Sequence, residues 1–215
     1  MGNQIINKIL ANPVIPVFYD DDLSICIQVL ESCYRGGIRV FEFVNRGEAA
    51  EENFRELFKY KNQYFPDLSL GIGTILNADQ AKRFIALDAD FLVSPLFSDA
   101  IAQIAKANDS FWIPGCMTPS EIGAAHQAGF NFIKIFPGGS LGPSFVKGIR
   151  PIFPDIYLMP TGGVECTQSS IKSWFDAGVN AVGLGSKLFE KIGQEYQYEQ
   201  IQKNCAALLG WAPKG

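Results

Sequence analysis

Short runs of β-branched and aromatic residues alternate with longer segments of helical periodicity along the whole chain. Runs of this kind are typical of buried parallel strands, and the periodic segments between them are typical of crossover helices. The predicted strands cover residues 14–18, 38–44, 68–72, 91–94, 111–114, 132–136, 156–159 and 181–184. The predicted helices include residues 47–63, 77–87 and 118–129, the last with Thr118 and Glu121 as a capping box, and one helix at each end, residues 3–12 and 195–210.

The number and spacing of these units favour a TIM (β/α)8 barrel over an open, doubly wound sheet. Eight strand-helix units of about 20 to 25 residues fit a chain of 215 residues. The chain contains no linker, low-complexity tract or charge block that would divide it. We therefore expect one barrel domain over residues 1–215, with an extra helix at the amino end and another at the carboxyl end.

One predicted strand carries a lysine among residues that avoid water. In the segment Phe-Ile-Lys-Ile-Phe, Lys134 shares one strand face with Phe132 and Phe136. Burial of an ammonium group costs several kcal/mol unless the group has a partner or loses its proton. Lys134 is therefore either a structural lysine whose head reaches the strand end, or a catalytic amine.

A carboxylate on the second predicted strand is a candidate partner. Glu42 shares a strand face with Val40 and Val44, and both this face and that of Lys134 can point into the barrel. Two interpretations follow. The two side chains form a buried ion pair, or a partly neutral lysine forms a Schiff base beside a glutamate that moves protons.

The other strand ends supply polar residues and glycines at the edge where barrels hold their active sites. They are Arg46, Thr74, Ser94 with Pro95, the turn Thr161-Gly162-Gly163, and Gly183-Leu184-Gly185-Ser186. Glycines also end strands for steric reasons, so each glycine turn alone is a weak signal. At consecutive strand ends the two turns favour a phosphate held by backbone N–H groups, and we expect Gly185 and Ser186 to begin a helix there.

Composition and charge argue against other classes of protein. The net charge of −4 and the scattered basic residues provide no surface for nucleic acid. The amino-terminal segment lacks the apolar core of a signal peptide, and no later segment approaches the ~18 apolar residues of a membrane span. We therefore expect a soluble, cytoplasmic protein that binds neither nucleic acid nor a membrane.

The sequence gives no indication of a metal site. The five cysteines are odd in number and widely spaced, which fits reduced thiols better than disulfides or zinc. Cys26 and Cys33 lie seven residues apart on a predicted helix and are expected to pack in the core. His126, the only histidine, lies on a predicted helix and is expected to be a surface or packing residue. We expect neither a metal nor a cofactor.

Six segments together resemble the class I aldolases that act on 2-keto-3-deoxy-6-phosphogluconate (KDPG), also described as 4-hydroxy-2-oxoglutarate (KHG) aldolases. The segments are GGIRVFEFVNRG, GIGTILNADQA, DFLVSP, IPGCMTPSEI, IKIFPGG and MPTGGV, and they occur in the family's order within residues 12–190. The resemblance implies a metal-free enzyme, typically trimeric, that cleaves a phosphorylated keto acid.

The resemblance also implies roles for individual residues. Lys134 would form an imine with the keto acid, and Glu42 would act as general acid and base. The implied substrate contacts are Arg46 and Thr74 to the carboxylate, Thr161 near the keto acid, Gly162, Gly163, Gly185 and Ser186 to the phosphate, and Pro95 and Phe136 as pocket walls.

Two departures from the family's pattern concern the substrate. Arg46 has Asn45 before it and Gly47 after it, where many relatives have leucine and threonine. The GLGS loop and the segment LGPSFVKGI are more similar to enzymes that cleave 2-keto-3-deoxy-6-phosphogalactonate (KDPGal). The sugar stereochemistry therefore stays open. A different phosphate-binding barrel enzyme, such as an isomerase or decarboxylase, and a noncatalytic phosphate binder also stay open.

Overall fold

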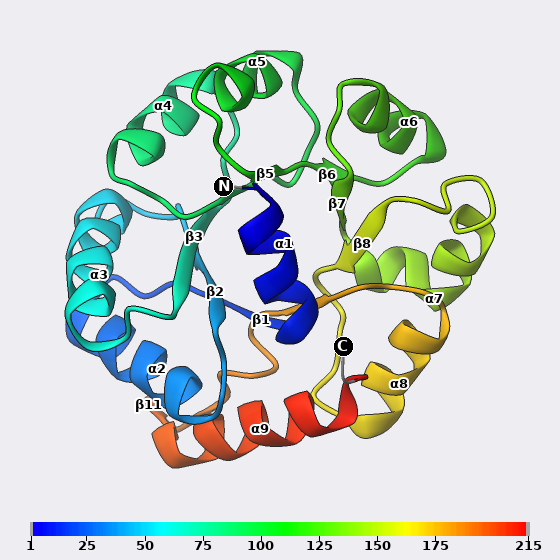
Figure 1. Cartoon of the computed structure of the whole chain (residues 1–215). Coiled ribbons are helices and arrows are strands. Elements are labelled where there is room, and N and C mark those ends of the chain that lie inside the picture. Colours follow the sequence, from blue (N-terminus) through cyan, green and yellow to red (C-terminus); the bar gives the residue numbers. More distant parts are fainter. Residues whose placement is uncertain (1, 214–215) are drawn as a thin grey trace.

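A ring of parallel strands lies inside a ring of helices in the computed structural model, which describes residues 2–213 (Figure 1). The helices are α1 (Gly2–Ala11), α2 (Leu23–Arg35), α3 (Ala50–Tyr64), α4 (Ala78–Ala86), α5 (Asp99–Ala107), α6 (Pro119–Gln127), α7 (Gly138–Ile149), α8 (Gln168–Asp176) and α9 (Tyr198–Trp211). The strands are β1 (Val14–Phe18), β2 (Val40–Val44), β3 (Ser69–Gly73), β4 (Leu92–Val93), β5 (Trp112–Ile113), β6 (Gly115–Cys116), β7 (Phe132–Ile135), β8 (Tyr157–Pro160), β9 (Val182–Leu184), β10 (Lys191–Ile192) and β11 (Glu195–Tyr196).

The strand ring closes through two short connections. One sheet has the order β5-β4-β3-β2-β1-β9, and the other has the order β6-β7-β8. Pro114 separates β5 from β6 because it has no N–H, yet its carbonyl accepts a bond from the Lys134 N–H at 2.9 Å. A parallel bridge between Thr161 and Gly183 joins β8 to β9. With β5 and β6 as one interrupted strand, the described residues form a closed barrel of eight parallel strands, as the sequence predicts.

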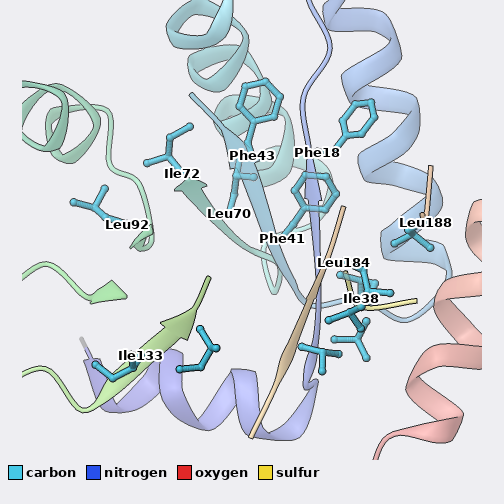
Figure 2. Close-up of a cluster of buried hydrophobic side chains, with 14 of the residues drawn as sticks. Phe18, Ile38, Phe41, Phe43, Leu70, Ile72, Leu92, Ile133, Leu184 and Leu188 are labelled. Atoms are coloured by element: carbon cyan, nitrogen blue, oxygen red, sulfur yellow. The ribbon is translucent and has the colours of Figure 1, made fainter. Parts of the chain in front are cut away.

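Side chains of each strand alternate between the barrel interior and the helices. On β2, Phe41 and Phe43 point outward and pack with Leu70 and Ile72 of β3 beneath the helices (Figure 2). The interior holds a separate apolar cluster. Its fully buried members include Ile15, Val40, Phe91, Val93, Ile113, Phe132, Met159 and Ala181. Glu42 and Lys134 follow Val40 and Phe132 by two residues each, so both lie on the inward face, as predicted.

Helix α1 closes the amino-terminal end of the barrel. It crosses the centre of the ring in Figure 1, and its Ile5 and Ile9 side chains belong to the interior cluster. The lower interior is therefore filled with apolar atoms, and polar chemistry is confined to the carboxyl ends of the strands.

The predicted helices are confirmed with small shifts of their ends, except near residue 195. Residues 191–196 form the antiparallel hairpin β10–β11, and α9 begins at Tyr198. The expectation that Gly185 and Ser186 begin a helix is also wrong. Only two i to i+3 bonds form there, Leu188 N–H to Gly185 O (2.9 Å) and Phe189 N–H to Ser186 O (3.1 Å), because Leu188 and Phe189 turn into the core and the chain then enters the hairpin.

Smaller expectations hold as well. Thr118 and Glu121 form the capping box of α6. Cys26 and Cys33 are buried on α2. Within residues 2–213, every helix is too short or too polar to span a bilayer.

Replacement of Ile9 by alanine tests the closing role of α1. Ile9 is fully buried in the interior cluster, so the variant leaves a cavity and should lower the free energy of unfolding by about 2 to 5 kcal/mol in urea titrations. Ile152→Ala is the control, because this side chain is exposed between α7 and β8, and it should change stability by less than about 0.5 kcal/mol. Equal losses in the two variants would contradict the closing role.

Candidate active site

A buried ion pair joins two strands inside the barrel. Nζ of Lys134 on β7 donates to Oε1 of Glu42 on β2 at 3.1 Å. The side chains are 6% and 1% exposed, so water screens the pair only weakly. Because each charge would be costly to bury alone, the two groups stabilise one another's position. The predicted partnership of Lys134 and Glu42 is confirmed.

Two buried side-chain oxygens at the carboxyl end of the barrel have no hydrogen-bond partner among the described residues. They are Oε2 of Glu42 and Oγ1 of Thr161. An unsatisfied buried polar atom costs about 1 to 3 kcal/mol, and in a native structure it often marks a place for water or a ligand. The ring of Phe136 lies 5.5 Å from Nζ of Lys134 and forms an apolar wall. The site therefore combines a cation, a carboxylate, two unused acceptors and an aromatic face.

The glycine turn after β8 presents backbone N–H groups. Gly162 and Gly163 have φ values of 80° and 79°, which residues with a side chain seldom adopt. The carbonyl groups of this turn pack against the start of α7. Gly138 N–H donates to Thr161 O at 2.8 Å, and Gly139 N–H donates to Gly162 O at 2.6 Å. Within the described part of the chain, the N–H groups of Gly162 and Gly163 donate to no protein acceptor. A Cβ placed on Gly162 would lie 3.6 Å from the Phe136 ring, so this turn borders the same site.

A pocket of about 350 Å³ opens at the carboxyl ends of β1, β2 and β9. Its lining includes Arg46, Gly185 and Ser186 from the predicted set. Tyr19 and Tyr196 also line it, and the sequence patterns did not identify them. The Tyr196 hydroxyl, on the hairpin, donates to Oδ2 of Asp20 at 3.2 Å. Burial together with Asp20 raises the pKa of Tyr196 to about 12, so the phenol keeps its proton at neutral pH.

Thr74 and Pro95 lie at the same edge of the barrel, and neither forms a hydrogen bond with Lys134. Thr74 has a φ of 61°, an uncommon value for a β-branched residue. The backbone of Pro95 packs against Gly115, which is the register partner of Lys134 on β6. The backbone of Pro95 therefore lies close to the strand position of Lys134.

The structure describes no cluster of metal-binding side chains. Within residues 2–213, no three or more His, Cys, Asp and Glu side chains gather closely enough to hold an ion. His126 is exposed on α6, and its Nδ1 forms a hydrogen bond with Oδ1 of Asn131 at 2.7 Å, which confirms its assignment as a surface residue.

Known proteins are similar to this chain in sequence and in fold. Residues 5–204 match the family model described as KDPG and KHG aldolase. A 2-dehydro-3-deoxy-phosphogluconate aldolase of Pseudoalteromonas atlantica is 33% identical over 157 residues, which cover 73% of this chain and 71% of the relative. A 2-dehydro-3-deoxy-6-phosphogalactonate aldolase of Escherichia coli is 32% identical over 65% of this chain and 66% of the relative, just under two thirds of its length.

The solved structures agree. A KDPG aldolase from Legionella pneumophila, with pyruvate captured as a covalent carbinolamine intermediate, superposes with a TM-score of 0.83 at 27% identity, covering 94% of this chain and 97% of that one. The match of the family model over residues 5–204, in a barrel that places an amine and a carboxylate together at its carboxyl end, leads to one conclusion. The chain belongs to the KDPG and KHG aldolase family and is an aldolase.

Proposed function

We propose that the protein is a Schiff-base aldolase that cleaves KDPG to pyruvate and glyceraldehyde 3-phosphate, and that also accepts 4-hydroxy-2-oxoglutarate. The observation that carries this proposal is the contact of 3.1 Å between Lys134 and Glu42 at the buried carboxyl end of the barrel. The carbinolamine captured in the Legionella pneumophila relative supports a covalent amine mechanism. Lys134 is the nucleophile, and Glu42 is the general acid and base.

The first step requires a neutral amine. Transfer of one proton from Lys134 to Glu42 across their hydrogen bond gives a neutral pair without changing the net charge of the site. The Nζ lone pair then attacks the C2 carbonyl of the keto acid, and one proton of the amine passes to the carbonyl oxygen, which gives a carbinolamine. The carbinolamine hydroxyl then takes a proton from Glu42 and leaves as water. The product is an iminium ion, and Glu42 is again a carboxylate that faces it.

The iminium ion then accepts the electrons of the C3–C4 bond. Glu42, directly or through water, removes the proton of the C4 hydroxyl as this bond breaks, and the aldehyde departs. The electron pair remains on C3 of an enamine, which takes up a proton that Glu42 can return. Addition of water to the restored iminium ion releases pyruvate and the Lys134 amine. Oε2 of Glu42, which has no partner among the described residues, is available for the C4 hydroxyl.

The substrate contacts in this proposal are those that the family resemblance implies. We propose Arg46 and Thr74 for the carboxylate, Thr161 beside the keto acid, Gly162, Gly163, Gly185 and Ser186 for the phosphate, and Pro95 and Phe136 as walls. The unused N–H groups of the glycine turn support the phosphate site. Arg46 is exposed and makes no ion pair with a described residue, so its side chain can turn from the pocket it lines with Ser186 toward the keto acid.

A KDPGal aldolase is the second candidate. The observation that favours it is that the relatives named for the two sugar acids are equally similar to this chain, at 33% and 32% identity. The two substrates differ in the configuration of one carbinol carbon, so the Lys134 and Glu42 chemistry serves either. Comparison of kcat/KM for the two compounds decides between them.

We also propose a homotrimer. Three loops that follow the neighbouring strands β3, β4 and β6 expose Leu76, Leu96 and Met117 at the carboxyl edge of the barrel. Exposed apolar side chains that gather on one face often mark a contact with another chain. The trimer expected from the family resemblance would bury this face against a neighbouring chain.

The imine prediction uses pyruvate and borohydride. Wild-type protein should gain one reduced adduct per chain at Lys134 in intact-mass measurements, and Lys134→Arg should gain none, because guanidinium keeps the charge but does not form an imine. Glu42→Gln is the matched variant. It should still form the adduct, but more slowly, because water can exchange these protons in place of Glu42, while exchange of pyruvate methyl protons with heavy water slows by about 100- to 10,000-fold. Substantial cleavage by Lys134→Arg, or undiminished exchange in Glu42→Gln, would contradict these roles.

The phosphate prediction compares Gly162→Asp with Gly162→Asn. The two side chains have the same shape and both tolerate a positive φ, but only aspartate repels a phosphate. Like charges about 4 Å apart near a protein surface repel by about 4 kcal/mol, so kcat/KM for the phosphorylated substrate should be roughly 1,000-fold lower in the aspartate variant than in the asparagine variant. For 4-hydroxy-2-oxoglutarate the two variants should be similar. Equal ratios for both substrates would remove Gly162 from the phosphate site.

The trimer prediction uses sedimentation equilibrium. Wild-type protein should have three times the mass of one chain. Leu76→Lys/Leu96→Lys should shift it toward monomers, because the interface would have to bury two ammonium groups. Ile152→Lys, at an exposed position between α7 and β8, should leave the trimer intact. A monomeric wild-type protein would reject the assembly.

A further inference from the structure

The residue next to the Glu42 carboxylate on the neighbouring strand is Gly73, the last residue of β3. Gly73 pairs in register with Val44 of β2. A Cβ placed on Gly73 would overlap Oε1 of Glu42 and would lie 2.7 Å from Cδ and 3.0 Å from Cγ. Oε1 is the oxygen that accepts the hydrogen bond from Lys134. The space that a side chain at position 73 would take is therefore occupied by the carboxylate itself.

We propose that Gly73 is a positioning residue for the aldolase reaction, because the missing side chain is what allows the Glu42 carboxylate to lie against Lys134. This inference rests on the proposed roles of Lys134 and Glu42. It concerns neither the phosphate nor the carboxylate contacts of the substrate. It assigns a role to a residue that touches no reacting atom and acts only through Glu42.

An added methyl group at position 73 changes the chemistry more than the fold. The overlapping atoms are the end of a flexible side chain, so rotation of Glu42 relieves the overlap without a backbone shift. That rotation takes Oε1 away from Lys134 and leaves the ammonium group without its partner. The cost therefore falls on proton transfer between these two groups and, because the ammonium group is buried, on stability as well.

Gly71, two residues earlier on the same face of β3, provides a matched control. A Cβ there would overlap the ring of Phe91, which is fully buried in the interior cluster and has no room to turn. The three atoms nearest to this Cβ all belong to Phe91, so Gly71→Ala disturbs the core beside the site first and does not displace the Glu42 carboxylate directly. It reports what packing strain alone does to activity.

The experiment measures four variants: Gly73→Ala, Glu42→Asp, the double variant, and Gly71→Ala. Aspartate is one methylene shorter, so its carboxylate withdraws from the space that a methyl group at position 73 would fill. We expect Gly73→Ala to lower kcat for cleavage about 100-fold with little change in KM, and to slow pyruvate proton exchange to a similar extent. Because Glu42→Asp already withdraws the carboxylate, the double variant should be no slower than Glu42→Asp alone. Gly71→Ala should lower the urea midpoint.

Each outcome decides the inference. Activity of Gly73→Ala within about threefold of wild type would overturn it, and so would losses that multiply in the double variant. If Gly73→Ala does not fold, folding of the double variant supports the inference, and failure of both overturns it. Absence of a pyruvate adduct in wild-type protein would instead reject the proposed function, which separates the two failures.

Discussion

The structure is organised around one buried charge pair. Lys134 and Glu42 lie almost completely out of water, where each charge alone would cost several kcal/mol, so their mutual contact is a condition for burying either. The contact spans β7 and β2, which lie far apart in the order around the barrel. Only a closed barrel points two such strands toward a common axis. The fold therefore brings the two groups together, and the pair requires the barrel to stay closed.

The interior around the pair is graded from apolar to polar along the barrel axis. Ile5 and Ile9 of α1 fill the amino-terminal end, and Val40 and Phe132 occupy the layer beneath the charges. Water therefore has access only from the carboxyl end, where Oε2 of Glu42 and Oγ1 of Thr161 remain unsatisfied. In the proposed mechanism, a keto acid that enters from this side meets the amine in a medium of low dielectric constant, in which hydrogen bonds to developing charge are strong. The apolar amino-terminal end of the barrel and the charged pair above it thus contribute to the same proposed chemistry.

The sequence was sufficient to predict the strands and the central pair, because both depend on local alternation. Phe132, Lys134 and Phe136 share a face whatever the neighbouring strands are, and a lysine on such a face requires a partner. The hairpin β10–β11 and the turn at Gly185 were not predictable in this way. A glycine and a serine after a strand fit a helix start and a turn equally well, and the choice depends on how Leu188 and Phe189 pack in the core. The proximity of Gly73 to Glu42 could not be predicted from the sequence either, since it depends on the register between β2 and β3 and not on any spacing along the chain.

The difference between strands and loops also bears on substrate choice. The pair is held by strand ladders, whose geometry changes little when surface residues are replaced. Arg46, Ser186 and Tyr196 lie on loops and the hairpin, where replacements alter the pocket without moving the ladders. In the proposed mechanism, the Lys134 and Glu42 pair would therefore serve either of the sugar acids for which the relatives are named, and these loops and the hairpin would select the stereochemistry of the substrate.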